Sequence, residues 1–232
     1  MIRSLVRVLP CLAVALCAAC EDGSLSLSIL RNLVSTPPGC LVPEAKEDGL
    51  GLSRGTLDVA VGSAYYMIPL VRNDQAERTS GASPTFDQIT VVGFDVQVNG
   101  DAALVGALQQ RAFTASAFGG SLGASDLAAI SVRVLSAEAI TQMAPAAADG
   151  KQHEITIHMR AIGKRADTTF TSYWIDYPIT VCDGCLNAGQ SITTACPDPL
   201  PTPPSGLSCN AGQDGGYYCC TLNGAIKCLH SP

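Results

Sequence analysis

Alternating apolar and polar residues dominate the chain between Thr56 and Cys182. This period of two places the apolar side chains of each run on one face of a β-strand. The runs are TLDVAV, YYMIPLV, FDQITVVGFDVQV, AAISVRVL, HEITIHMRAIG and TTFTSYWIDYPITV. In the last run the predicted inward face consists of Tyr173, Ile175, Tyr177, Ile179 and Val181. Trp174 lies on the opposite face.

Turn and cap signals separate the runs. Asn99-Gly100 predicts a type I′ hairpin turn, because both central residues of that turn need a positive φ. GKRAD predicts a second hairpin loop, and SAEAITQMA predicts one short helix with Ser136 as its N-cap. The segment AALVGALQQRAFTASAF is less regular. SLSLSILRNLV fits either a short strand or a helical turn.

About seven strands with few helices predict a mainly β fold. Two antiparallel sheets packed face to face, as in immunoglobulin-like or fibronectin-like β-sandwiches, would bury the apolar faces most economically. A barrel is the alternative. The chain lacks the Cys…Trp…Cys spacing of an antibody-type domain.

Composition changes divide the chain into five parts. Residues 1–19 resemble a signal peptide. Residues 20–55 are expected to form a tether, and residues 56–196 are expected to form the β-sandwich domain. Residues 197–208 contain the run PDPLPTPP, which predicts a stiff polyproline II linker. Residues 209–232 predict a small cysteine-rich C-terminal module, too small to fold without disulfides.

The first twenty residues carry an export signal. Arg3 and Arg7 precede a short apolar segment, Leu9 to Ala19, and small residues lead to Cys20. This stretch resembles the lipobox of bacterial lipoproteins, although Cys17 stands where the motif usually has leucine. The resemblance implies cleavage after Ala19, a diacylglycerol thioether on Cys20 and acylation of the new amino group, for example by palmitate. Several acyl chains would anchor the protein firmly to a membrane.

The net charge bears on the class of partner, and the residue after Cys20 bears on the membrane to which the protein is sent. The chain has a formal charge of −6, and loss of Arg3 and Arg7 with the leader leaves 12 basic against 20 acidic side chains, or −8. Such a surface disfavours nucleic acid and other polyanions. Glu21 follows the lipid cysteine in place of aspartate, which by the lipoprotein sorting rule implies the bacterial outer membrane.

Eleven cysteines predict an oxidising compartment and a disulfide framework. Cys11 and Cys17 leave with the signal and Cys20 takes the lipid, so eight remain for disulfides. The proline-rich linker divides them evenly: Cys40, Cys182, Cys185 and Cys196 precede it, and Cys209, Cys219, Cys220 and Cys228 follow it. We expect no bridge between the two groups. Cys40 should pair with one of the three later cysteines before the linker.

Two connectivities of the C-terminal group remain open. Either Cys209 pairs with Cys219 and Cys220 with Cys228, or Cys209 pairs with Cys220 and Cys219 with Cys228. A bridge between the adjacent residues Cys219 and Cys220 would strain the peptide between them.

Catalytic patterns are few. Gly119 to Gly123 matches G-x-S-x-G, which would make Ser121 a nucleophile with Asp149 and His153 downstream in hydrolase order. The parallel sheet and crossover helices of that fold are not predicted, so a loop between strands is the preferred interpretation. Cys182-Asp183-Gly184-Cys185 lacks the helix of a redox motif and further ligands for zinc, so we expect a structural disulfide.

The other candidate residues are assigned to packing or to the surface. His153 and His158 lie five apart in one predicted strand and therefore on opposite faces, which excludes a metal-ligand pair within it. We assign them and His230 to solvent or capping roles, and the pair Tyr217-Tyr218 to packing of the C-terminal module. The sequence predicts no metal and no cofactor.

The combined expectation is a lipid-anchored envelope protein with a non-enzymatic binding or structural role, whose protein or glycan partner the sequence does not identify. An envelope serine hydrolase using Ser121 and an accessory subunit of a larger envelope assembly are the alternatives.

Overall fold

The computed structural model describes residues 25–35, 41–76, 88–117, 119–186, 195–196, 211–215, 217–223 and 225–230. Cys20, Cys40, Cys209 and the proline-rich linker lie outside these residues. Within them, no helix is long and apolar enough to cross a membrane.

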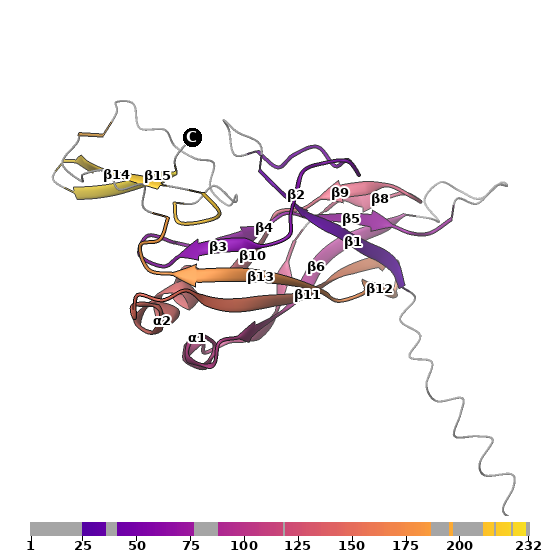
Figure 1. Ribbon diagram of the computed structural model, residues 1–232. Coiled ribbons are helices and arrows are strands. Elements are labelled where there is room, and N and C mark those ends of the chain that lie inside the picture. Colours follow the sequence, from indigo (N-terminus) through magenta and orange to yellow (C-terminus); the bar gives the residue numbers. More distant parts are fainter. Residues whose placement is uncertain are drawn as a thin grey trace, which may run out of the picture.

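The described chain is mainly β, as predicted, with two short helices (Figure 1). In chain order the elements are β1 (Leu25–Leu33), β2 (Gly51–Leu52), β3 (Gly55–Asp58), β4 (Tyr65–Met67), β5 (Pro69–Asn73), β6 (Ile89–Gly100), α1 (Ala102–Ala107), β7 (Ala112–Ser116), β8 (Ser121–Leu122), β9 (Leu127–Ala129), β10 (Val132–Leu135), α2 (Ala137–Ala147), β11 (His153–Arg165), β12 (Thr168–Ser172), β13 (Ile175–Cys182), β14 (Tyr217–Leu222) and β15 (Ala225–His230).

One mixed sheet of eleven strands replaces the expected sandwich of about seven. Its path runs β3-β13-β11-β12-β1-β5-β9, and β6 joins β11 to β7 and β8. The β1–β12 and β3–β13 pairs are parallel, whereas the other pairs are antiparallel. Two separate antiparallel ribbons complete the architecture, β4 with β10 and β14 with β15. The two-sheet prediction is therefore wrong in strand number and in topology.

A single main core lies between the large sheet and the β4–β10 ribbon. Tyr65 and Met67 of β4 and Val132 and Val134 of β10 belong to the same buried cluster as Phe94 of β6. These side chains are at most 2% exposed. The alternation seen in the sequence thus buries one face of each strand, even though the strands are arranged differently.

The two edges of the β4–β10 ribbon have different neighbours. On the β4 side, the segment Ala211–Gly215 joins β4 to β3. The backbone N–H of Asp58 donates to the Gly212 carbonyl at 2.8 Å, and that of Asp214 donates to the Thr56 carbonyl at 2.9 Å. The Gln213 side chain, fully buried, bonds to β4. On the β10 side, the ribbon faces β7 across a groove.

Several local predictions are confirmed. Ser136 caps α2 by accepting a hydrogen bond from the Ala139 N–H at 3.2 Å. The GKRAD segment turns β11 into the antiparallel β12, with Arg165 opposite Thr168. For SLSLSILRNLV the sequence left strand and helical turn open, and the segment forms the strand β1.

Two other local predictions are wrong. Asn99-Gly100 makes no hairpin, because Asp101 accepts from the Ala103 N–H and begins α1 directly after β6. Tyr173 points to solvent at 69% exposure, because the chain leaves the sheet between β12 and β13.

Candidate functional site

The groove between β7 and β10 has a volume of about 450 Å³. Its walls are residues 113–116 of β7 and residues 133–136 at the end of β10, and Val98 and the loop 108–110 also line it. Glu138, Ala139 and Gln142 of α2 complete the lining. A volume of this size lies in the range of ligand-binding clefts.

Both walls present strand edges rather than strand faces. Neighbouring side chains of a strand point to opposite faces, so a cavity beside one face is lined by every second residue. Here four consecutive residues line each wall. In the described chain β7 pairs only with β6 and β10 only with β4, so each strand has an open edge.

The backbone of β7 directs alternate peptide groups into the groove. Val98 N–H donates to the Arg111 carbonyl, and Ala117 N–H donates to the Val92 carbonyl. Because bonded and non-bonded pairs alternate in an antiparallel ladder, the pairs of Phe113 and Ala115 with β6 are bonded ones. The N–H and C=O groups of Thr114 and Ser116 therefore point away from β6, toward the open edge.

On the other wall, the backbone of β10 directs the N–H and C=O groups of one residue, Arg133, into the groove. Both backbone groups of Tyr66 bond to the Gln213 amide, on the side of β4 away from β10. Arg133 stands opposite Tyr66 in the ribbon. This is consequently a non-bonded pair, and the N–H and C=O groups of Arg133 point away from β4 into the groove.

Side chains give the groove a mixed polar and apolar lining. Phe113 and Leu135 supply apolar surface. Gln142 links α2 to the loop 108–110, since its Oε1 accepts from the Gln109 N–H at 3.1 Å. Its Nε2 donates to Glu138 of the same helix at 3.3 Å. The Thr114 hydroxyl donates to Asp95 at 2.8 Å. Such a lining suits a ligand that is polar and makes many hydrogen bonds.

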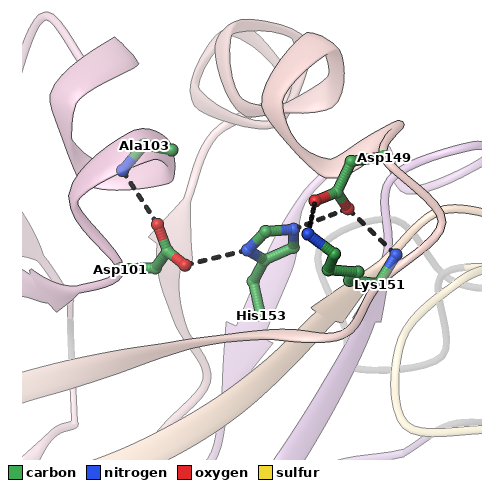
Figure 2. A network of polar contacts seen from close by, with 5 residues as sticks. All are labelled: Asp101, Ala103, Asp149, Lys151 and His153. Atoms are coloured by element: carbon green, nitrogen blue, oxygen red, sulfur yellow. Dashed lines mark hydrogen bonds and ion pairs between the residues drawn. The ribbon is translucent and has the colours of Figure 1, made fainter.

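A carboxylate–imidazole–carboxylate chain holds both helices beside the groove. Figure 2 shows His153, at the start of β11, between Asp101 and Asp149. Its Nδ1 lies 2.8 Å from Asp101 Oδ2 and its Nε2 lies 3.0 Å from Asp149 Oδ1. Asp101 caps α1 and Asp149 follows α2, so one side chain fixes an end of each helix. We call these three residues the His153 clamp.

Hydrogen bonding sets the protonation of the His153 clamp. The bonds to Asp101 and Asp149 raise the pKa of His153 above its usual 6.5. The same bonds lower the pKa of both carboxyl groups, with help from the backbone N–H groups of Ala103 and Lys151. Both ring nitrogens can donate only when the imidazole is protonated, so the clamp is complete in the charged form.

The residues of the alternative hydrolase interpretation are only partly brought together. Asp149 and His153 are hydrogen-bonded, but Ser121 lies in β8 opposite Thr90, near the start of β6. Ile155 pairs with Gly100 at the other end of β6. Ten strand residues separate these positions by about 33 Å. Ser121 therefore cannot transfer a proton to His153, and its hydroxyl contacts that of Thr90 at 3.0 Å.

Three disulfides are described: Cys182–Cys185, Cys196–Cys220 and Cys219–Cys228. The structural disulfide expected at C-x-x-C is present. Cys219–Cys228 belongs to one of the two open connectivities of the C-terminal group, but neither connectivity is right as a whole, because Cys220 pairs with Cys196. The expectation that no bridge joins the two groups is wrong, because Cys196–Cys220 does so. Cys40 also cannot pair with a later cysteine before the linker, since all three are bonded elsewhere. The strand-like pairing of Ala195 with Thr221 explains the crossing bridge.

The C-x-x-C loop is built around a buried carboxylate. Asp58 is fully buried, and its side chain accepts from the N–H groups of Gly184 at 2.7 Å and Leu186 at 2.9 Å. Asp58, Cys182 and Cys185 bring three potential metal-ligand atoms within 4.8 Å of one another. The two sulfurs are bonded to each other, however, and the carboxylate holds the loop.

The prediction that the two strand histidines lie on opposite faces is confirmed. His153 lies on the face of β11 that carries Ile155 and Ile157, and His158 lies on the outer face. His158 stacks on Trp174 with ring centroids 4.4 Å apart and bonds to Asp176 at 2.6 Å. The side chains of Tyr217, Tyr218 and His230 lie outside what the structure describes.

Comparison with known proteins gives no family. No family model matches the chain, and no curated protein matches it. Among solved structures it is similar to a "protein from Archaeoglobus fulgidus", with 10% identity over 55% of this chain and 93% of that one. The TM-score of 0.33 is too low to carry an argument about fold or function.

Sequence reasoning missed the groove entirely. Thr114, Ser116 and Arg133 carry no motif, and their role comes from backbone direction rather than side-chain chemistry. Apolar–polar alternation marks β10, whereas β7 lies in the segment that the sequence shows as less regular, and neither pattern says which strand edges remain unpaired.

Proposed function

We propose that this chain is a lipid-anchored exported envelope protein with a non-enzymatic binding role, and that the groove between β7 and β10 is its binding site. The observation that carries the proposal is the groove itself. Its two walls direct peptide groups of Thr114, Ser116 and Arg133 into one cavity of about 450 Å³.

The acylated Cys20 would hold the domain at the bacterial outer membrane. Four residues separate it from Leu25, where β1 begins. A tether this short would keep the β domain close to the lipid surface. The formal charge of −8 favours protein or neutral glycan partners over polyanions.

Lipidation is tested by mass and by partitioning. The mature protein should begin at Cys20, carry acyl mass on that residue and enter the detergent phase. Cys20→Ser should abolish all three properties. A wild-type protein that stays in the aqueous phase with an unmodified Cys20 would contradict the anchor without affecting the groove.

Binding is tested by photo-crosslinking in intact cell envelopes. A photoreactive residue at Gln110, exposed on the groove rim, should give a defined adduct. The same residue at Asp167, exposed in the β11–β12 turn, serves as the matched control and should give none. Ala139→Trp, which fills the groove from α2, should remove the Gln110 adduct. Equal adducts at both positions, or an adduct that survives Ala139→Trp, would contradict the proposal.

A further inference from the structure

We infer that the ligand of the groove is an extended polypeptide segment that adds as a strand to β7. This inference rests on the proposed function and identifies the chemical class of the ligand. It is carried by the direction of the backbone groups in the groove, and it is supported by a second segment of the same chain that pairs with the edge of β3 through backbone hydrogen bonds.

The open edge of β7 has the repeat of an extended peptide. The outward peptide groups of Thr114 and Ser116 are two residues apart, a spacing of about 6.8 Å in a strand. Each position offers one N–H donor and one C=O acceptor. An added strand satisfies this pattern with its own alternating groups, which is the basis of β-strand addition. Arg133 offers the same pair of groups from the opposite wall.

The gap on the other side of the β4–β10 ribbon shows an edge that is already paired. There the turn segment Ala211–Gly215 forms a single antiparallel bridge between Gln213 and Leu57 of β3, and its Gly212 and Asp214 exchange backbone hydrogen bonds with Asp58 and Thr56. At the same time the Gln213 amide pairs with both backbone groups of Tyr66 on β4. One short segment thus pairs with two facing strand edges. The groove has the same two kinds of wall, in β7 and β10, and none of the residues that the structure describes pairs with them there.

The rest of the lining agrees with a peptide ligand. A peptide presents side chains alternately to either side of its backbone, and the groove offers apolar surface at Phe113 and Leu135 beside the amides of Gln109 and Gln142. An oligosaccharide would find hydroxyl-binding partners here, but its hydroxyl groups do not repeat the donor–acceptor pattern of the strand edge.

Proline variants test the backbone bonds directly. Proline lacks the N–H group and is tolerated at strand edges where that group faces outward. Thr114→Pro and Ser116→Pro should keep the ladder to β6 and block strand addition. Thr114→Val and Ser116→Ala are the matched controls, because they change the side chain and keep the N–H. Circular dichroism and thermal unfolding report whether each variant folds, and two independent proline positions guard against the misfolding of one.

The probes are a linear decapeptide library displayed on phage and a set of soluble peptidoglycan oligosaccharides, each offered to the full mature chain in lipid nanodiscs. We expect selected peptides to bind the wild type, to lose at least tenfold in affinity for both proline variants, and to stay within threefold for the controls. Backbone amide resonances of Thr114 and Ser116 should shift when a selected peptide binds.

Three results would overturn the inference, and they separate it from the proposed function. Peptide affinity unchanged in both folded proline variants would exclude strand addition. Oligosaccharides that shift the groove resonances, with no peptide selected, would keep the binding role and replace the ligand class. No shift with either probe would remove both the inference and the groove as a binding site.

Discussion

The side-chain amide of Gln213 pairs with the backbone of Tyr66 as a peptide group of a neighbouring strand would. Its Nε2 donates to the Tyr66 carbonyl at 2.6 Å, and its Oε1 accepts from the Tyr66 N–H at 3.0 Å. The two residues are 147 positions apart in the chain. This contact closes one gap beside the β4–β10 ribbon, and the absence of an equivalent contact in the described part of β7 and β10 leaves the groove.

Gln213→Ala should destabilise the fold by about 2–4 kcal/mol. Gln213 is fully buried, and its loss would leave two part-buried backbone groups of Tyr66 without partners, each costing about 1–3 kcal/mol. Urea unfolding measures the change. Gln109→Ala, which removes an exposed glutamine side chain, is the matched control and should stay within about 0.5 kcal/mol of wild type. A Gln213→Ala variant as stable as this control would contradict the assigned contact.

Tyr65 should ionise only at strongly alkaline pH, and Asp214 should contribute to this. Burial raises the pKa of Tyr65 well above 10, and the nearby Asp214 carboxylate raises it further. Its hydroxyl lies 2.7 and 2.8 Å from the two carboxylate oxygens. Since the neutral phenol is favoured in the folded state, stability should fall as the pH rises above about 10.

Ultraviolet titration near 295 nm measures this ionisation. Asp214→Asn removes the negative charge and should lower the pKa of Tyr65, while burial keeps it above that of an exposed tyrosine. Tyr173→Phe removes an exposed tyrosine and identifies its share of the signal. An unchanged Tyr65 titration in Asp214→Asn would show that Ala211–Gly215 is not docked as described.

The His153 clamp should make stability depend on pH in two ranges. Because the pKa of His153 is raised in the folded state, its contribution to folding stability is fully present below its usual pKa of 6.5. This contribution is lost as the pH rises through the folded-state pKa. Because the pKa values of Asp101 and Asp149 are lowered, their contribution to stability is fully present above pH 3.8 and is lost as the pH falls through the folded-state pKa values. The clamp therefore stabilises most between about pH 4 and 6.5.

Urea unfolding between pH 5 and 9 tests the upper range, with an NMR titration of the His153 ring. His153→Gln should flatten the loss of stability with rising pH, because glutamine carries no titrating proton. His158→Gln is the matched control on the outer face of the same strand. If His153→Gln and wild type lose stability in parallel, the clamp does not control the helices.

The disulfide map should hold the C-terminal hairpin to the rest of the chain. Cys182–Cys185, Cys196–Cys220 and Cys219–Cys228 leave two of the eight cysteines that follow Cys20, namely Cys40 and Cys209, and we expect these to pair. Cleavage within residues 197–208 should release no fragment until the protein is reduced. A tail fragment freed without reduction would contradict the Cys196–Cys220 bridge.

The sequence predicts what is local and misses what depends on distant partners. Ser136 and its helix were predictable because the cap and the chain it caps are three residues apart. The strand faces were predictable because alternation reports burial. Asn99-Gly100 misled because its turn signal competes with Asp101, which caps a helix. Gly100 has a φ of +126°, and a Cβ there would lie 2.6 Å from the Glu154 carbonyl oxygen, so it serves a close strand approach instead.

The candidate site depends on partners that are distant in the sequence. Strand alternation identifies β10 as a strand, whereas β7 lies in the less regular segment. Which of their edges stays open depends on every other pairing in the fold. Gln213, which follows the proline-rich linker, pairs with the edge of β4 at Tyr66, and no local sequence pattern connects these two residues. Asp149 and His153 were considered for catalysis only as partners of Ser121 in the alternative hydrolase interpretation, and the structure places them with Asp101 at the ends of two helices.

Amide hydrogen exchange along β7 tests the open groove edge most directly. In the free protein, the N–H groups of Phe113 and Ala115 should exchange slowly because they face β6, and those of Thr114 and Ser116 should exchange fast. The N–H groups of Thr56 and Asp58, covered by Asp214 and Gly212 on the closed side, should be protected and serve as the internal reference. Thr114 and Ser116 protected as strongly as Phe113 and Ala115 would show that the edge is already paired, and the groove could not bind a ligand as described.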